Sequence, residues 1–126
     1  MKRSRLKPVS AKRKSQTRAR RQLIDAVMER DKHSCQARLP ECSFHATDVH
    51  ELKTRARGGS IFEMSNCVAL CRTCHSWITE HPAWASEHGF MLHATAQEAE
   101  YRAAERERQR WLYGEDIETG DDDEDA

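Results

Sequence analysis

The chain has 126 residues, of which 37% are hydrophobic and only 6% aromatic, so it is expected to hold one small domain with a thin apolar core. No run approaches the roughly 18 apolar residues of a membrane span, and no apolar segment follows the basic start MKRSRLKP, which argues against membrane insertion and export. We therefore expect a reducing, cytoplasmic setting, in which the five cysteines serve a metal site better than disulfides.

The formal net charge of zero hides a separation of charge along the chain. Residues 1–21 contain ten Lys and Arg residues and no acid, whereas residues 115–126 contain eight Asp and Glu residues and no base. Basic arms attract phosphate backbones through counterion release without reading sequence. We interpret residues 1–14 as a disordered basic arm and residues 115–126 as a disordered acidic tail. The tail is chiefly solubilising in this interpretation, with shielding of the arm or mimicry of nucleic acid as alternatives.

An amphipathic helix is predicted over residues 15–31. Apolar side chains recur there at helical spacing from Leu23 to Met28, between charged positions. Its apolar stripe is most simply a core face, and its arginines extend the basic arm onto a folded surface. This helix begins the predicted domain, residues 15–93.

Four of the five cysteines form two pairs, Cys35 with Cys42 and Cys71 with Cys74. The six residues between the first two are more than the usual gap of two to four in zinc sites, so the first pair alone is a weak signal. Together the pairs supply the four thiolates of a closed tetrahedral zinc site. A disulfide or inert buried thiols are the alternatives. The remaining Cys67 is interpreted as a small core residue.

Between the cysteine pairs the sequence indicates a strand, a turn and a second apolar run. Residues 47–52 have the character of a short strand, and Gly58 and Gly59 turn the chain back. The glycines permit a positive φ or a close approach of the backbone to a phosphate, and a plain turn is equally compatible. Asn66 then precedes the apolar residues 67–70.

Three basic side chains near this turn, Lys53, Arg55 and Arg57, lie where a nucleic-acid strand beside the site would need positive charge. The apolar residues Ile61, Phe62 and Met64 are expected to pack beneath the turn.

Three helices are predicted in the remainder of the chain. The first two span residues 72–80 and 82–87. The third, within a C-terminal segment 94–114, follows a capping box at residues 95–98, runs to Tyr113 and ends at Gly114. Its larger side chains share one broad side, so it packs either on the domain or on a partner.

The histidines at positions 33, 45, 81, 88 and 93 show no spacing typical of a metal pair, and we interpret them as ordinary polar positions.

The stretch from Cys35 to His75 resembles the zinc-containing HNH endonucleases found in phages and mobile elements. In that family a strand end carries a metal ligand followed by a general-base histidine, a loop holds a Gly-Gly pair, a middle asparagine orients the site, and a helix supplies the last histidine. Asn66 matches the middle position and His75 the last. The resemblance implies an α+β fold with a small ββα-metal (His-Me finger) core stapled by a structural zinc site of four cysteines.

The first position departs from the family pattern, and two assignments remain open. Counting back from the glycine pair makes His50 a metal ligand with His75 and puts Glu51 at the general-base position. A slip of one residue instead makes His50 the base and Asp48, on the same strand face, a ligand. The second is chemically favoured because the unperturbed imidazole pKa lies near neutrality. A weakened or inactive enzyme is the third interpretation.

Hydrolysis of a phosphodiester needs an activated water, stabilisation of developing charge and a grip on the strand. The base at residue 50 or 51 serves the first need, and a divalent ion held by His75 and a strand ligand serves the second. Mg²⁺ or Mn²⁺ is expected, and Ni²⁺ and Zn²⁺ also suit such ligands. Asn66 is expected to hydrogen-bond the base or its loop.

The sequence therefore favours a metal-dependent HNH endonuclease that hydrolyses DNA, either nicking or cutting both strands. By resemblance, phage DNA packaging and homing are its candidate roles, in the host cytoplasm if the protein is phage-encoded. A zinc-stabilised nucleic-acid-binding module without catalysis is the alternative. A third is an accessory factor of a DNA-processing complex that meets a protein partner through the C-terminal helix or the acidic tail.

Overall fold

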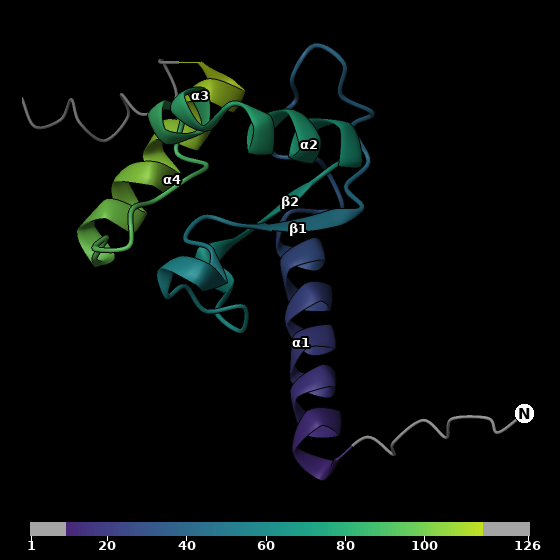
Figure 1. Cartoon of the computed structure of the whole chain (residues 1–126). Coiled ribbons are helices and arrows are strands. Elements are labelled where there is room, and N and C mark those ends of the chain that lie inside the picture. Colours follow the sequence, from purple (N-terminus) through teal and green to yellow (C-terminus); the bar gives the residue numbers. More distant parts are fainter. Residues whose placement is uncertain (1–9, 115–126) are drawn as a thin grey trace, which may run out of the picture.

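The computed structural model of the chain describes residues 10–114. Residues 1–9 of the predicted basic arm and the predicted acidic tail, residues 115–126, lie outside this range. The described elements, in order, are α1 (Ala11–Arg30), β1 (Asp48–Glu51), β2 (Cys67–Leu70), α2 (Arg72–Glu80), α3 (Pro82–Glu87) and α4 (Glu98–Tyr113). Two 3-10 turns, Arg55–Arg57 and Met64–Asn66, lie between the strands. The predicted α+β class is confirmed (Figure 1). None of these helices is long and apolar enough to cross a membrane.

Helix α1 begins four residues earlier than predicted, at Ala11. The side chain of Ser10 caps it, because its Oγ accepts a hydrogen bond of 3.1 Å from the backbone N–H of Arg13. Residues 11–14 were predicted to be part of a disordered arm, but Ala, Lys and Arg are strong helix formers and extend the helix instead. Only the C-terminal part of α1 packs on the domain, and its exposed first half projects away from the other elements (Figure 1).

The two strands form an antiparallel hairpin in which Asp48 pairs with Leu70 and His50 pairs with Val68. Because side chains alternate along a strand, these residues share one face of the hairpin, and the intervening Val49 lies on the other. The face of His50 is covered by α2 and α3, and the face of Val49 by α1.

Each face of the hairpin has its own apolar cluster. The larger one joins β2 to α2 and α3 through fully buried side chains that include Leu52, Ile78 and Phe90. The smaller one joins the other face to Val27 of α1, and it contains Cys67, which is therefore the core residue predicted from the sequence. Burying one large apolar side chain stabilises a fold by roughly 1.5–3 kcal/mol. The hairpin is thus the layer against which both halves of the domain pack.

The two short helices have the bounds expected from the sequence, Arg72–Glu80 for α2 and Pro82–Glu87 for α3. Cys71 caps α2, because its Sγ accepts from the backbone N–H of Cys74 at 3.4 Å. Pro82 occupies the first turn of α3, where its missing N–H costs nothing.

Helix α4 ends at Tyr113 before Gly114, as predicted, but its start was placed wrongly. The capping box consists of Gln97 and Glu100, whose Oε1 accepts from the Gln97 N–H at 2.8 Å. The preceding residues 93–96 form a turn that buries Ala96, which moves the cap two residues beyond the predicted position.

Helix α4 packs on the domain through the side that was predicted to carry its larger side chains. Ala104 is buried, and its carbonyl lies so close to Gly89 that a Cβ on that glycine would come within 2.2 Å of the oxygen. The indole N–H of Trp111 donates to the carbonyl of Ala37 in the cysteine loop. These contacts tie α4 both to the chain after α3 and to the loop after α1.

Candidate functional site

The four cysteines predicted as ligands come together at one end of the hairpin. The Sγ atoms of Cys35, Cys42, Cys71 and Cys74 all lie within 4.8 Å of one another, and no disulfide joins them. Cys42 Sγ and Cys71 Sγ are 3.8 Å apart. A tetrahedral ion with metal–sulfur bonds of about 2.3 Å requires sulfur–sulfur edges of about this length. The cluster can therefore hold a structural metal ion such as zinc.

Backbone N–H groups point at two of these sulfurs and favour their ionised form. Cys71 Sγ accepts from Cys74, and Cys42 Sγ accepts from the N–H of Phe44 at 3.1 Å. Burial tends to raise the pKa of Cys71, but hydrogen bonds from Cys74 and Ser43 outweigh it and lower that pKa to about 6. Burial raises the pKa of Cys42 to about 11. A bound metal ion removes the remaining thiol protons.

A second group of polar side chains lies where α2 meets β1. Asp48 Oδ2 accepts a hydrogen bond of 2.8 Å from Nδ1 of His75 and another of 2.8 Å from Nε of Arg72. The rings of His50 and His75 meet edge to face with their centroids 5.2 Å apart. The structure therefore brings Asp48, His50 and His75 together, and each comes from an element bordering the cysteine cluster.

Both histidines use one ring nitrogen within the fold. His75 donates from Nδ1 to Asp48, and His50 donates from Nε2 to the carbonyl of Phe90 at 2.6 Å. These bonds leave Nε2 of His75 and Nδ1 of His50 with their lone pairs. Both lone pairs can bind a metal ion, and the carboxylate behind His75 fixes its tautomer and orientation.

The charge state of this group follows from its surroundings. Burial lowers the pKa of His50 to about 4 and outweighs the hydrogen bond to the Phe90 carbonyl, which acts to raise it; the positive charge of Arg108 adds to the lowering. Burial acts to raise the pKa of Asp48, but hydrogen bonds from Arg72 and His75 outweigh it and lower that pKa. At neutral pH His50 is thus a neutral imidazole beside an ionised carboxylate.

Glu51 is not part of this group. It lies on the face of β1 that α1 covers, and its Oε2 is 3.4 Å from Nη2 of Arg20. The structure therefore separates the two residues between which the general-base position was left open, with one on each face at the end of the same strand.

Asn66 pins the loop between the strands. Its Oδ1 accepts from the N–H of Lys53 at 2.9 Å and from the hydroxyl of Tyr101 at 3.1 Å. Its Nδ2 donates to the carbonyls of Lys53 and Ser60, both at 2.9 Å. Because the amide is 1% exposed, this full set of bonds is what makes its burial tolerable. Asn66 thus bonds to the loop and to α4 rather than to His50.

The glycine pair serves this same loop. Gly58 has a φ of +91° and ends the 3-10 turn, a conformation that suits glycine. A Cβ on Gly59 would lie 1.7 Å from the carbonyl oxygen of Lys53. The close approach of the backbone that the sequence offered to a phosphate is made here to the backbone of Lys53.

The three basic residues predicted to contact nucleic acid point in different directions. Lys53 Nζ donates to the carbonyl of Ala96 at 3.3 Å, and Arg57 donates to the carbonyl of Leu92 at 3.4 Å. Both therefore bind the segment that leads into α4. Arg55 instead lines a groove against α1. Phe62, which was expected to pack beneath the turn, borders this groove and is 42% exposed.

Comparisons with protein-family models, with curated proteins and with solved structures give no match to this chain. Its site therefore has to be interpreted from its own geometry.

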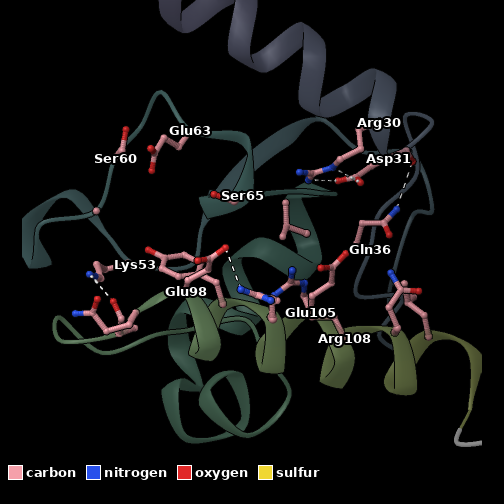
Figure 2. A pocket seen from close by; sticks show the side chains of 18 of the residues that line it. Arg30, Asp31, Gln36, Lys53, Ser60, Glu63, Ser65, Glu98, Glu105 and Arg108 are labelled. Carbon is pink, nitrogen blue, oxygen red and sulfur yellow. Dashed lines mark hydrogen bonds and ion pairs between the residues drawn. The ribbon is translucent and has the colours of Figure 1, made fainter. Parts of the chain in front are cut away.

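A cavity lies elsewhere in the domain. It has a volume of about 810 Å³ and lies between α4, the loop after β1 and the end of α1. Figure 2 shows Glu105 and Arg108 rising from α4 on one side, with Arg30 and Asp31 on another. Basic and acidic side chains alternate on its walls, and neither His50 nor His75 lines it.

Sequence reasoning missed the contribution of α4 to the polar site. Arg108 donates to the carbonyl of Gly89 at 2.6 Å, one residue before the carbonyl that His50 binds. Burial lowers the pKa of Arg108 to about 10. Its place on the apolar side of the predicted helix was the available signal, because a charged residue on a buried stripe usually has a buried acceptor.

The histidines interpreted as ordinary polar positions include two with structural contacts. His81 stacks on Trp77 with ring centroids 3.8 Å apart, and His88 stacks on Trp84 at 4.0 Å. Each donates from Nδ1 to the carbonyl of the tryptophan it covers. They belong to the packing of α2 and α3 rather than to a metal site.

Proposed function

We propose that this chain is a metal-dependent nuclease of the HNH type, whose hairpin and α2 form a ββα-metal core and whose substrate is DNA. The observation that supports this most is the meeting of His50 and His75 from β1 and α2, each with one nitrogen left over by its hydrogen bond. Two oriented imidazoles at the junction of a strand and a helix suit a divalent ion.

In this proposal His50 and His75 hold the ion, and Asp48 orients His75. A pKa of about 4 makes His50 a poor proton acceptor at neutral pH but a good ligand, because protons do not compete for its nitrogen. A bound divalent ion would supply Lewis-acid stabilisation of charge on the phosphate oxygens.

Glu51 is then the candidate that accepts the proton of the attacking water. It ends β1 next to His50, and its side chain is 21% exposed. Its contact with Arg20 is long, at 3.4 Å, and to act as the base its carboxylate must swing around the end of β1 from the face that α1 covers. This assignment retains the family's spacing, in which the residue after the ligand is the base.

The cysteine cluster and Asn66 have supporting roles. The cluster fixes the start of α2 through Cys71 and Cys74, directly before His75. Asn66 fixes the loop that leaves β1, directly after Glu51 and Leu52. Both ends of the site are therefore held by groups that do not take part in the reaction.

The test is nicking of a supercoiled plasmid in Mg²⁺ or Mn²⁺, with zinc content measured for every protein. The His50→Ala, His75→Ala and Glu51→Gln variants are each expected to lose about 100-fold or more in rate. His81→Ala removes a histidine of α3's cap that lies outside the site and should keep the wild-type rate.

A titration with Mn²⁺ separates the two roles. Loss of a ligand should raise the Mn²⁺ concentration needed for half the maximal rate, whereas Glu51→Gln should lower the maximal rate at an unchanged Mn²⁺ requirement. A wild-type protein that retains zinc and leaves the plasmid supercoiled with every ion would refute the nuclease proposal.

A zinc-stabilised nucleic-acid-binding module without catalysis is the second candidate. One observation favours it: within residues 10–114 the four cysteines are the group of three or more ligands whose donor atoms converge, and Asp48, His50 and His75 do not form a second such group. It predicts DNA binding that is insensitive to substitution of both histidines.

A further inference from the structure

A groove of about 600 Å³ runs between α1 and the turn after β1. Its walls carry four arginines and no carboxylate, together with two polar and three apolar side chains. The lining residues are Arg13, Gln16, Thr17, Arg20, Arg21, Ile24, Arg55, Ile61 and Phe62. We call this the arginine groove.

The helical part of the arginine groove is one face of α1. Counted from Arg13, its members stand at i, i+3, i+4, i+7, i+8 and i+11 (Ile24), which places them on a single stripe. At 1.5 Å per residue this stripe is about 16 Å long. Lys12, Lys14 and Arg18 belong to the same helix but do not line the groove, so half of the six basic residues from Lys12 to Arg21 lie on this face.

Arg20 makes the groove a built feature of the fold. Its guanidinium donates to the carbonyl of Ile61 and contacts Glu51, so it fastens the turn after β1 to α1 across 41 residues of chain. The other three groove arginines, Arg13, Arg21 and Arg55, are exposed. They are available to an anionic partner.

The apolar part of the groove indicates the kind of partner. Phe62 is 42% exposed at one wall, beside the partly buried Ile61 and Ile24. Duplex DNA presents phosphates to such a surface but keeps its base faces stacked. Arginines alternating with an exposed aromatic ring are what single strands require, because the phosphates meet the cations and an unpaired base stacks on the ring.

We propose that the arginine groove binds a single-stranded segment of DNA next to the bond that is cut. This rests on the proposed function in taking DNA as the nucleic acid and in placing the bond that is cut near the end of β1; binding in the groove is tested separately from cleavage. The groove lies on the face of β1 that carries Glu51, and Arg20 belongs to both. A DNA strand lying in the groove therefore reaches the end of β1, where Glu51 and His50 are neighbours on opposite faces of the hairpin.

The test is fluorescence anisotropy without divalent ions, so that binding is measured in the absence of cleavage. The probes are a fluorescein-labelled 20-mer of thymidylate and a labelled 20-base-pair duplex, each titrated at several salt concentrations. The Arg13→Ala/Arg21→Ala double variant should bind the single strand about tenfold more weakly, with a salt slope lower by about 1.4. The Lys12→Ala/Arg18→Ala variant removes the same charge from the same helix and should change affinity by less than about threefold.

Stacking is tested at the same time. Phe62→Ala should weaken binding of the single strand about tenfold and leave duplex binding unchanged. The matched control is Phe44→Ala, which removes a ring that is 65% exposed in the cysteine loop, away from the groove. Circular dichroism and zinc content should be those of the wild type for all four variants.

Equal losses of single-strand affinity in the two double variants would refute the groove as the binding site, because the charge of α1 alone would then explain binding. Preferential binding of the duplex with no effect of Phe62→Ala would overturn the single-strand assignment. Either result is independent of nicking: a protein that fails to cleave but loses single-strand binding only in the groove variants refutes the nuclease proposal and supports the groove.

Discussion

The cysteine cluster and the group formed by Asp48, His50 and His75 share helix α2 but differ in how their atoms are arranged. The four sulfurs converge on one point, and three of the cysteines are fully buried. The polar group instead bonds to itself and to the backbone, and the side chain of His75 is 31% exposed. A closed arrangement suits a structural ion, whereas the proposed catalytic ion needs open positions.

In the proposed function, the two groups divide the metal chemistry of this small domain. A fold with a thin core gains stability from a site that is complete and inaccessible. A site that is to bind substrate must leave nitrogen lone pairs uncommitted, and it depends on its neighbours for orientation. In the proposed function Cys74 and His75, adjacent in sequence, belong to the two kinds of site.

The largest effect is expected from breaking the cysteine cluster. Cys74→Ser should abolish stoichiometric zinc binding and cooperative folding, because a structural zinc site contributes roughly 10 kcal/mol or more, comparable with the whole stability of a domain. Zinc analysis and far-UV circular dichroism measure both. The control is Cys67→Ala, which truncates the buried cysteine outside the cluster and should retain one zinc per chain. A folded, zinc-loaded Cys74→Ser protein would show that the cluster is dispensable.

A smaller effect is expected from the titration of His50. Its pKa is about 4 in the folded chain and near 6.5 when unfolded, so the unfolded state binds the proton more readily and stability falls as the pH drops through this window. Urea unfolding should give roughly 1 kcal/mol less stability from this group at pH 5.5 than at pH 7.5.

The matched variant for this prediction is His50→Gln, whose amide can still donate to the Phe90 carbonyl but does not titrate. The difference between wild type and this variant isolates His50 from acid effects on the cysteines. If the two proteins lose equal stability between pH 7.5 and pH 5.5, His50 is not the neutral, buried group described above.

The smallest effect concerns the contact of α4 with the site loop. Tyr101→Phe removes one hydrogen bond to Asn66, whose Oδ1 keeps its bond to the Lys53 N–H, and should cost about 1 kcal/mol in thermal unfolding. Tyr113→Phe, at an exposed ring at the end of the same helix, should be nearly neutral. Equal shifts in the two variants would mean that the Tyr101 hydroxyl contributes no net stability.

Residue types that mark the starts and ends of helices explain which parts of the structure could be predicted from the sequence. Helix α3 begins at Pro82, a residue type that marks helix starts, and α2 begins directly after its cap, Cys71. The cysteine cluster follows from the spacing of its two pairs. The start of α1 was missed because Ser10 stands within a run of positive charge that resembles a disordered arm, although it is a good helix cap.

The contacts that shape the polar site could not be predicted in the same way. His50 is held by the backbone carbonyl of Phe90, forty residues away. Because every residue type has a backbone carbonyl, the sequence does not indicate this contact. Period-two alternation does place Asp48 and His50 on one face, as expected, and Glu51 on the other. The burial that lowers the pKa of His50 depends on packing of distant segments, including α4, which no local pattern encodes.

Helix α4 contacts the Asn66 loop through Tyr101, the chain beside Phe90 through Arg108, and the cysteine loop through Trp111. During synthesis these residues leave the ribosome after every candidate catalytic residue has already emerged. A nascent chain that ends near Gly89 contains both strands and all four cysteines, yet it lacks Phe90 and the α4 residues that anchor its loops. The order of translation thus delays completion of the site until the domain is nearly whole.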